Sequence, residues 1–546
     1  MKGLICFILT ATCCASLAAQ PKVNFKVEKT NFRKDTISIL RFGAVADGQT
    51  LNTKAINEAI TACSKKGGGV VAVPAGLWMT GPVELKSNVN LYLAQNAILQ
   101  FSKDFDQFPL VAGNWEGMPQ MRNQSPLFAN NAVNIAVTGK GIVDGNGDAW
   151  RMVKKDKLNE TQWKKLIASG GLLSEDKKTW YPSEKSFKGS QLKNPGEITA
   201  AKTQSFYDSV KDFLRPNLLV LNNCNKILLE GVTFQNSPAW CLHPLLCQNL
   251  TVRNVNVKNP WYAQNGDGID VESCSNVLIE NSVFDVGDDG ICVKSGRDEA
   301  GRKRGKPTQN MIVRNSTVYH AHGGFVIGSE MSGGANNIFV SQCSFLGTDI
   351  GLRFKTTRGR GGIVENIFVT DITMKDIVGE AILFDMYYAA QDPVPLAGEK
   401  RELPKVEMKP VDETTPQFRK FTVNNIVCNG ADKAVFIRGL PEMHVRDISF
   451  SNMTLQSRLG MDIQEASGIR FDNVNLISTA TNPVVDIAQS DALTFNGITV
   501  PVSSTLIYRI SGDRSAGIRL GKTNGANAAK KFSAELGADE KKIIVE

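Results

Sequence analysis

The chain has 546 residues, enough for one very large domain or for three domains of ordinary size. Hydrophobic residues make up 42% and charged residues 21%, which is typical of a globular protein and argues against a disordered or fibrous class. The net charge of +8 is spread along the chain without a dense basic block, so we expect no nucleic-acid partner. This charge would suit an acidic polymer as partner, although an ordinary soluble surface explains the total equally well.

The first predicted element is a secretory signal peptide at residues 1–19. A lysine, an apolar run and small residues precede a cleavage point after Ala18 or Ala19. We therefore expect a secreted or periplasmic protein. A surface lipoprotein anchored near Cys13 and Cys14 is less favoured, because the residues before this pair fit that signal poorly. No later stretch has the roughly 18 apolar residues that a membrane span needs.

Residues 20–110 are expected to form an N-terminal cap and the first coils of a repeat structure. The spacing of Ala55, Ile56, Ala59 and Ile60 predicts a helix from about Thr53 to Lys66 with one apolar face. Such a helix can cover the open end of a sheet and protect its edge from pairing with other chains.

Residues 111–520 are predicted to form a right-handed parallel β-helix of about ten coils. An asparagine followed by β-branched and apolar residues recurs at intervals of 24 to 34 residues, which indicates a solenoid built from short strands. The repeats begin at Asn225, Asn249, Asn276, Asn310, Asn337 and Asn366. We expect these asparagines to stack in turns and to bond the backbone of the next coil. A β-propeller is the alternative fold, but its repeat would be nearer 40–50 residues.

Two other segments depart from the strand repeat. Residues 151–215 form an insert with two helical stretches, ETQWKKLIAS and KTQSFYDSVKDFL, while residues 521–546 are expected to be a tail or a short packed helix.

Eight cysteines follow the signal peptide without zinc-site spacing, so we expect no metal and no cofactor. Most should be buried thiols, although Cys241 and Cys247 could close a small disulfide loop. A β-helix buries its own core, so we expect a monomer.

The candidate site lies between residues 265 and 355. Asp267 and Asp289 are 22 residues apart, and His322 follows about one such interval later once a basic insert near 297–306 is discounted. If the chain winds in coils of this length, these groups stack about 4.8 Å apart per coil. The expected stripe contains Asp267, Asp288, Asp289, His322, Arg353 and Lys355.

This set of side chains suits the hydrolysis of a glycosidic bond. One carboxyl group protonates the leaving oxygen, and a second activates water or attacks the sugar. Crowded carboxylates raise the pKa of at least one of them. Gly287 and Gly290 would let Asp288 and Asp289 enter one cleft at a turn or bulge. Single aspartates of this kind are more often turn residues or calcium ligands, but the complete set favours catalysis.

The cations that follow suggest a binder of carboxylates. Arg353 and Lys355 share one strand face, and Arg offers a bidentate fork. Arg358 and Arg360 could add further positive charge for binding carboxylates, or they could form a solvated surface. The second histidine, His320, is expected to have a packing role.

At these residues the chain resembles the polygalacturonases, glycoside hydrolase family 28. The family's motifs N-T-D, G/Q-D-D, G-H-G and R-I-K stand here as Asn265-Gly266-Asp267, Gly287-Asp288-Asp289, Ala321-His322-Gly323 and Arg353-Phe354-Lys355. The departures at 266, 321 and 354 leave the chemical groups in place. The resemblance implies inverting hydrolysis, with Asp288 as general acid supported by His322, and with Asp267 and Asp289 activating water. It also implies substrate binding by Asn265, Arg353, Lys355 and either Tyr387 or Tyr388.

The expected substrate is a pectic polysaccharide or oligogalacturonide. The insert and the IGSEMSGG segment are similar to those of bacterial exo-acting members, which implies release of monogalacturonate from a non-reducing end. A hydrolase of rhamnogalacturonan or another branched pectin is the alternative within the family. A calcium-dependent pectate lyase and a non-catalytic carbohydrate-binding β-helix are more remote, since neither needs the complete acid–base set.

Overall fold

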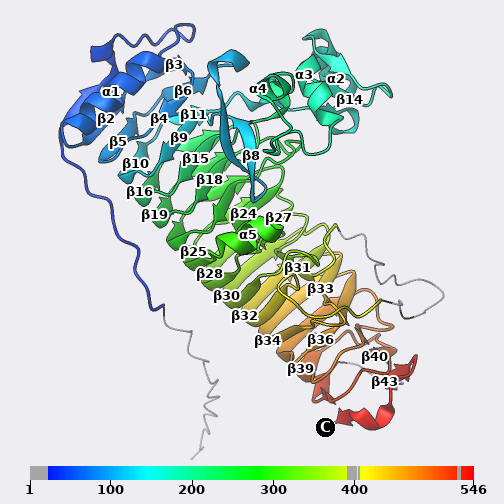
Figure 1. The fold of residues 1–546 in the computed structure, drawn as a ribbon. Helices are drawn as coiled ribbons and strands as arrows, with labels where there is room; N and C mark the ends of the chain where they lie inside the picture. The colour runs from blue at the N-terminus through cyan, green and yellow to red at the C-terminus, as the bar shows by residue number, and fades with distance from the viewer. Residues whose placement is uncertain (1–22, 390–402, 404–405, 526–529) are drawn as a thin grey trace, which may run out of the picture.

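The computed structural model describes residues 23–389, 403, 406–525 and 530–546, and they form a long right-handed parallel β-helix (Figure 1). The predicted fold class is confirmed, and the β-propeller alternative is wrong. The predicted signal peptide lies outside the described residues. Among the described residues, no helix is long and apolar enough to cross a membrane.

One long sheet forms a single face of the solenoid and contains 14 parallel strands. This is more than the ten coils expected, because the first coils lie before the asparagine repeats begin. Its strands are β4 (Val83–Glu84), β9 (Leu127–Asn130), β15 (Leu219–Asn222), β18 (Leu242–Leu245), β21 (Ile269–Glu272), β24 (Asp289–Lys294), β27 (Gly323–Ile327), β29 (Leu352–Lys355), β31 (Glu380–Asp385), β33 (Lys433–Arg438), β35 (Leu459–Gln464), β38 (Val485–Ala488), β40 (Leu506–Ser511) and β43 (Lys530–Glu535).

The other faces form one connected sheet of 25 strands. These are β1 (Thr36–Ser38), β2 (Gly69–Val73), β3 (Gly76–Thr80), β5 (Val89–Leu93), β6 (Ala97–Phe101), β10 (Val133–Gly139), β11 (Ile142–Asp144), β16 (Asn225–Glu230), β17 (Thr233–Gln235), β19 (Gln248–Arg253), β20 (Asn256–Lys258), β22 (Ser275–Glu280), β23 (Val283–Asp285), β25 (Thr308–Arg314), β26 (Thr317–Tyr319), β28 (Ala335–Leu346), β30 (Ile363–Lys375), β32 (Gln417–Asn429), β34 (Val445–Ser457), β36 (Ala466–Ser467), β37 (Arg470–Ser478), β39 (Thr494–Thr499), β41 (Ile518–Leu520), β42 (Thr523–Asn524) and β44 (Ile543–Val545).

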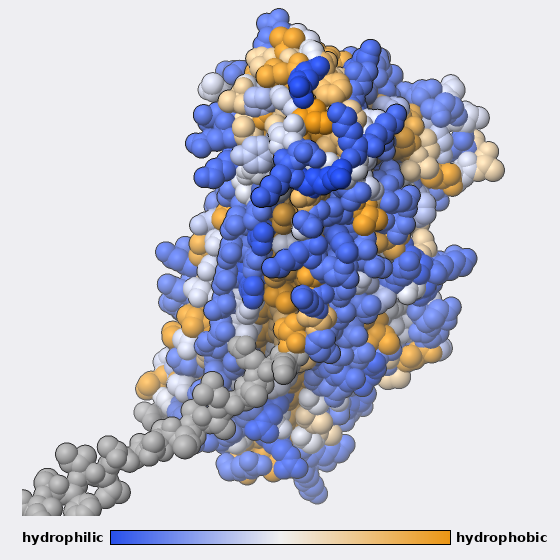
Figure 2. Space-filling view, turned by 90° about the vertical axis from the view of Figure 1, so that its left-hand side faces the viewer, coloured by the Kyte–Doolittle hydropathy of each residue, from blue (hydrophilic) through white to orange (hydrophobic). Residues whose placement is uncertain are grey.

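The core lies inside the coils and is built by stacking like residues on successive strands. Val313, Val340, Val369 and Val423 occupy one register position and are all buried. β-Branched side chains suit this position because they pack well on a pleated surface. Outward-facing positions are mostly polar, and most of the side seen in Figure 2 is hydrophilic.

The repeated asparagines from Asn225 to Asn337 stack as predicted, but they bond one another rather than the backbone of the next coil, and Asn366 donates to Asn336 at 2.8 Å. The amide of Asn249 donates to Asn225 at 2.9 Å, Asn310 donates to Asn276 at 3.1 Å, and Asn337 donates to Asn310 at 2.7 Å. Asn249, Asn310 and Asn337 have φ between 54° and 57°, a left-handed conformation that asparagine tolerates better than most residues. The ladder therefore fixes the turn between strands in each coil.

The predicted N-terminal helix is α1 (Thr53–Lys65), and its four expected apolar residues are all buried. The insert holds three helices, α2 (Glu160–Ala168), α3 (Glu184–Ser190) and α4 (Gln204–Asp208), with a small sheet of β12 (Val153–Lys154), β13 (Leu172–Leu173) and β14 (Thr179–Tyr181). A further helix, α5 (Asp298–Arg304), forms from the basic insert after β24. Residues 530–546, expected as a tail or helix, add strands β43 and β44 to the two sheets.

An antiparallel hairpin of β7 (Leu110–Trp115) and β8 (Met118–Asn123) was not predicted from the sequence. Figure 1 shows the hairpin, in light blue, crossing the front of the solenoid near β18 and β24. Its tip reaches the segment that leads into α5, where the backbone N–H of Arg297 donates to the Gly117 carbonyl at 3.2 Å. The hairpin thus bridges strands that are far apart in the sequence.

Candidate active site

The three predicted aspartates lie together at the start of neighbouring strands. Ile269 of β21 pairs with Ile291 of β24, so one coil here is 22 residues long and Asp267 stands next to Asp289. Asp288 lies in the bend that precedes β24, which allows two consecutive side chains to reach one site. One carboxylate oxygen from each aspartate lies within 4.8 Å of the others.

Gly287 and Gly290, which flank the two aspartates, are needed because a side chain would not fit at either position, and not because their backbone is left-handed. A Cβ on Gly287 would lie 2.5 Å from the Pro260 carbonyl oxygen, and one on Gly290 would lie 2.4 Å from a methyl group of Val318. Neither glycine has a positive φ. The bend that carries Asp288 and Asp289 can therefore pack this closely only without side chains at its two ends.

Asp289 is buried and paired with two cations. Lys355 Nζ lies 2.8 Å from Asp289 Oδ2, and Arg353 donates to Asp289 Oδ1 at 3.2 Å. Burial alone would raise the pKa of this carboxyl group, but Lys355, Arg353 and Lys294 together hold the pKa below its ordinary value. Asp289 is therefore ionised in the free protein at neutral pH.

Asp267 has the opposite environment. It is 3% exposed, and its Oδ1 atom has no hydrogen-bond partner in the described part of the chain. Burial, followed by the charges of Asp270 and Asp288, raises the pKa of Asp267 well above its ordinary value. The expectation that crowding raises at least one carboxyl pKa holds for Asp267. Asp267 therefore holds a proton more readily than Asp289 on the adjacent coil.

His322 lies beside Asp288, as the sequence predicted. Its Nδ1 atom is 3.4 Å from Asp288 Oδ1, and its Nε2 atom is 3.7 Å from Asp349 Oδ2. The bond to Asp288 raises the pKa of the His322 imidazole against the opposing effect of burial. The packing role expected for His320 is wrong, because its side chain is 60% exposed and pairs with Asp285 at 2.9 Å.

The two predicted tyrosines differ in their distances from the cations Arg353 and Lys355. Lys355 Nζ lies 4.8 Å from the centre of the Tyr388 ring, and the Arg353 guanidinium carbon lies 5.7 Å from it. Tyr387 is buried and faces the guanidinium of Arg438 at 5.2 Å. Tyr388 is therefore the tyrosine that lies at the cation pair.

Asn265 lies at the edge of the site, where its Oδ1 atom accepts from Arg215 at 2.9 Å.

The idea that Arg358 and Arg360 form a solvated surface is wrong. Arg358 is bound to Glu442 at 2.7 Å, and Arg360 is buried and paired with Asp298. Cys241 and Cys247 are free thiols, so the possible disulfide is not formed.

Sequence reasoning missed a second buried charge cluster beside the aspartates. Lys294 Nζ lies 3.0 Å from Glu330 Oε2 and 3.5 Å from Asp270 Oδ1. Burial opposes the charged forms, but the Lys294 charge still lowers the pKa of Glu330 to about 2. Strand alternation could have found two members, since Asp270 and Lys294 occupy outward positions on β21 and β24 just after the motif aspartates.

The hairpin and the strand face meet in a wall of aromatic residues. Trp115 stacks on Trp240 with ring centres 5.7 Å apart, and the Arg122 guanidinium carbon lies 3.8 Å from the Trp115 ring. Glu116 at the hairpin tip pairs with Arg297 at 3.2 Å. These contacts close the sheet face on the N-terminal side of the three aspartates.

The three aspartates could also be considered as ligands for a cation, since carboxylate oxygens are what hard cations prefer. However, both oxygens of Asp289 are already bonded to the cations Arg353 and Lys355. These charges oppose a metal ion at the same place. The arrangement is better suited to hold a water molecule and a sugar hydroxyl or ring oxygen.

Comparison with known proteins agrees with this geometry. The model for glycosyl hydrolases family 28 matches residues 198–434, which contain the predicted site residues from Asn265 to Tyr388. The crystal structure of a hyperthermoactive exopolygalacturonase from Thermotoga maritima is 30% identical, with a TM-score of 0.65, and the match covers 83% of this chain and 94% of that one. The chain belongs to glycosyl hydrolase family 28.

Curated relatives extend over most of this family 28 chain. A probable polygalacturonase of Vitis vinifera is 29% identical over 78% of this chain and 74% of its own length. An exo-poly-alpha-D-galacturonosidase of Dickeya chrysanthemi is 29% identical over 80% of this chain and 70% of its own length. A second model, for rhamnogalacturonase A/epimerase, pectate lyase-like proteins, matches residues 36–206. The family 28 enzyme is thus a polygalacturonase-type glycoside hydrolase acting on pectin.

Proposed function

We propose that this family 28 enzyme cleaves α-linked galacturonic acid by inversion and releases monogalacturonate from non-reducing ends of pectic chains. The observation that carries the proposal is the ionised Asp289, bound to Arg353 and Lys355 and placed within 4.8 Å of Asp267 and Asp288. Two carboxyl roles and a carboxylate-binding cation pair then meet at one point of the sheet.

Asp288 is the general acid in this proposal, and it protonates the oxygen of the leaving sugar. His322, 3.4 Å away, supports it by holding the carboxyl group in place. Water attacks the anomeric carbon from the other side and gives its proton to the pair Asp267 and Asp289. Since Asp289 is the ionised member, it accepts the proton, while Asp267, whose raised pKa favours its protonated form, holds the attacking water by a hydrogen bond.

Inversion rests on family membership rather than on the distance between the carboxylates. Carboxyl groups of inverting enzymes are typically about 6.5–9.5 Å apart, and those of retaining enzymes about 5–5.5 Å apart. The oxygen spacing of up to 4.8 Å is closer to the second value. Proton NMR of the first-formed product decides the point, because inversion of an α-linkage gives the β-anomer before mutarotation.

Arg353 and Lys355 bind the carboxylate of a galacturonate unit in this proposal, Tyr388 stacks against the same unit, and Asn265 bonds a hydroxyl. Both cations lie on the outward face of β29, and Asp289 leaves several of their N–H groups unpaired. A neutral sugar would leave these donors unsatisfied. The pair thus favours a uronic acid over its uncharged analogue.

Exo action is supported by the hairpin. Because its tip binds Arg297 and Trp115 stacks on Trp240, the sheet face beyond Asp267 is covered, and a polymer could not extend past that point. The names of the Thermotoga maritima and Dickeya chrysanthemi relatives describe exo-acting enzymes. We infer that this chain also binds one end of the polymer.

Export completes the proposal. The predicted signal peptide at residues 1–19 would place the enzyme in the periplasm or outside the cell, with a lipoprotein anchor as the less favoured route, and a monomer is expected. N-terminal sequencing of the mature protein tests this: Gln20 or a neighbouring residue at the new terminus supports cleavage, and an intact Met1 contradicts it.

The activity is tested by mass spectrometry of the products formed from defined oligogalacturonides with a chelator present. Hydrated monogalacturonate alone is the expected result. Mixed oligomers would contradict exo action only, and unsaturated products would indicate a lyase.

A second candidate, hydrolysis of rhamnogalacturonan, is favoured by the match of residues 36–206; cleavage of rhamnogalacturonan fragments but not of oligogalacturonides would establish it. Binding without turnover of either would indicate a non-catalytic β-helix.

A further inference from the structure

Asp270 is a further buried carboxyl group beside the three aspartates of the site. It lies on β21, shortly after Asp267, and it is 0% exposed. Neither of its carboxylate oxygens has a hydrogen-bond partner in the described part of the chain. Its one ion pair among those residues is with Lys294, whose Nζ atom lies 3.5 Å from Oδ1. A buried carboxylate without hydrogen bonds is costly, so the charge of Asp270 depends on this cation.

Lys294 is shared between Asp270 and Glu330. Its Nζ atom lies 3.0 Å from Glu330 Oε2 and 4.5 Å from the centre of the Trp240 ring, and the residue is 4% exposed. One positive charge therefore faces two buried carboxyl groups. Since the shorter contact is with Glu330, Asp270 receives the weaker compensation of the two.

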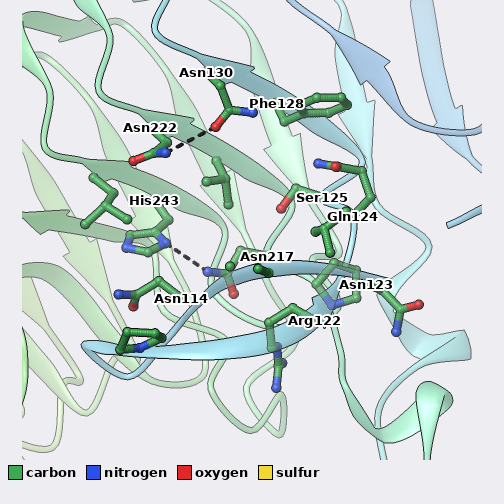
Figure 3. Close-up of a pocket in the computed structure, with 17 residues that line it drawn as sticks. Asn114, Arg122, Asn123, Gln124, Ser125, Phe128, Asn130, Asn217, Asn222 and His243 are labelled. Atoms are coloured by element: carbon green, nitrogen blue, oxygen red, sulfur yellow. Dashed lines mark hydrogen bonds between the residues drawn. The ribbon is translucent and has the colours of Figure 1, made fainter. Parts of the chain in front are cut away.

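Glu272 is the neighbour of Lys294 in the sheet, but it has a cation of its own. The two residues pair in register between β21 and β24. Glu272 bonds Arg304 and, at 2.8 Å, His243 Nε2. Asn217 holds the other nitrogen of this ring at 3.1 Å, as Figure 3 shows. Glu272 and Arg304 therefore form a neutral pair that does not need the charge of Lys294.

Other charged groups near this cluster also occur as opposite pairs. Arg360 is paired with Asp298. Arg215 faces Asp288, and the two act on Asp267 with opposite charges. None of these pairs changes the balance of charge among the buried groups of the site.

The remaining charges of the site do not balance. In the described part of the chain, four carboxyl groups face three cations. The carboxyl groups are those of Asp267, Asp270, Asp289 and Glu330, and the cations are Lys294, Arg353 and Lys355. A buried negative charge without a cation is so costly that the group takes up a proton instead. One of the four carboxyl groups therefore holds a proton at neutral pH.

The contacts of the four carboxyl groups favour Asp267 as the protonated one. Asp289 has a cation at 2.8 Å and Glu330 has one at 3.0 Å. Burial raises the pKa of Asp270, but Lys294 opposes this effect. Asp267 has no ion pair in the described part of the chain, and burial and then the charge of Asp270 raise its pKa well above the ordinary value.

We propose that Asp270 and Lys294 are positioning residues that keep a proton on Asp267 during hydrolysis. Asp270 supplies the negative charge that holds this proton, and Lys294 keeps Asp270 itself ionised. Asp289 is then the only member of its pair that can accept the proton of the attacking water, while Asp267 holds that water by a hydrogen bond. This role rests on the proposed function, in which these two aspartates face the attacking water.

The dependence of kcat on pH tests this role, because a purely structural change would lower kcat equally at every pH. Asp270→Asn removes the negative charge beside Asp267 and leaves three carboxyl groups for three cations. Asp267 then loses its proton more readily, so the high-pH limit of activity should move down by about one pH unit.

Lys294→Met should move the opposite limit. Lys294 is one of three cations that hold the pKa of Asp289 below its ordinary value against the effect of burial. Without it, Asp289 takes up a proton at higher pH, so the low-pH limit of activity should move up. The shift should be smaller than that in Asp270→Asn, because the two other cations remain.

Infrared spectroscopy at neutral pH reports the proton directly. The spectrum of the wild type minus that of Asp270→Asn should show the absorption of one protonated carboxyl group, because the charges balance in the variant. Asp285→Asn and Lys303→Met make the same substitutions at exposed positions and are the controls. Both should leave the pH limits unchanged, and Asp285→Asn should give no such difference. Thermal denaturation shows whether each variant is folded.

Unchanged pH limits in Asp270→Asn, or a difference spectrum without a protonated carboxyl group, would overturn the proposal. If Lys294→Met does not fold, the two measurements on Asp270→Asn decide alone. A chain that hydrolyses galacturonan with pH limits independent of Asp270 contradicts only this inference. A chain that gives the expected difference spectrum but hydrolyses no pectic substrate contradicts only the proposed function.

Discussion

Lys355 Nζ lies 2.8 Å from Asp289 Oδ2, although the two residues are 66 positions apart in the sequence. Strands β24, β27 and β29 are neighbours in one sheet, so the solenoid brings the two residues together across two coils. Lys355 keeps the Asp289 carboxylate ionised in a buried place. In the proposed function, the N–H groups of Lys355 that Asp289 does not use bind a substrate carboxylate.

Replacing Asp289 by asparagine should lower kcat by about 10²- to 10⁴-fold, because the proton acceptor is lost. It should also lower the free energy of unfolding by about 3–5 kcal/mol, since Lys355 and Arg353 are left buried without their partner. Release of reducing sugar measures the first effect and urea unfolding the second. Asp285→Asn is the matched control, because that side chain is 46% exposed and its one ion pair among the described residues is with His320. Full activity of Asp289→Asn would contradict the assigned role.

Acid should destabilise the enzyme partly through Glu330. The pKa of Glu330 is lowered from 4.5 to about 2 in the folded protein, where Lys294 lies 3.0 Å away. A lowered folded pKa stabilises the protein above the unfolded value, and this stability is lost as the pH falls from 4.5 to about 2. The contribution is about 3 kcal/mol.

Glu330→Gln removes that proton uptake. Between neutral pH and about pH 3, its free energy of unfolding should fall by about 2 kcal/mol less than that of the wild type, as measured by urea unfolding at each pH. Glu160→Gln, at an exposed position of α2, is the control and should follow the wild type. Parallel curves for Glu330→Gln and the wild type would show that the Lys294 pair does not set the acid stability.

The sequence predicted the solenoid and the stripe of charges because both repeat with the coil. Asp267, Asp289 and the asparagine ladder are each set by an interval that is visible in the chain. The hairpin lies outside this repeat. Its position depends on Trp115 meeting Trp240, and no interval connects those two residues. The contact of Arg215 with Asn265 could not be predicted either, because Arg215 lies at the end of the helical insert, outside the repeat.

The choice between Tyr387 and Tyr388 also could not be made from the sequence. Both follow the end of β31, where the alternation of strand residues between inside and outside stops applying. The structure places Tyr387 in the core and Tyr388 at the cation pair. Only the position of Lys355 on the preceding strand distinguishes them.

Tyr388→Leu should raise KM by about 2- to 30-fold, because the ring that contacts Lys355 and Arg353 is lost. Tyr388→Phe should behave like the wild type, since it keeps the ring. Tyr387→Phe is the neighbouring control, and its hydroxyl has no partner to lose among the described residues. Steady-state kinetics on an oligogalacturonide measure all three. A larger effect for Tyr387→Phe than for Tyr388→Leu would assign the substrate contact to the other tyrosine.

The wall at the hairpin should set the length of the product. Trp115→Ala removes the stack on Trp240 and frees the Arg122 guanidinium from its ring contact, so the covered end of the sheet opens. We expect di- and trigalacturonate to appear beside monogalacturonate in product mass spectra, with a loss of stability of about 0.5–1.5 kcal/mol from the stack. Tyr92→Ala, at an exposed position of β5, is the control and should leave the products unchanged. Because removal of the wall acts on where the polymer can lie and not on Asp289, the hydrolysis rate per bond should change less than the product pattern. Unchanged release of monogalacturonate alone would show that another segment closes the cleft.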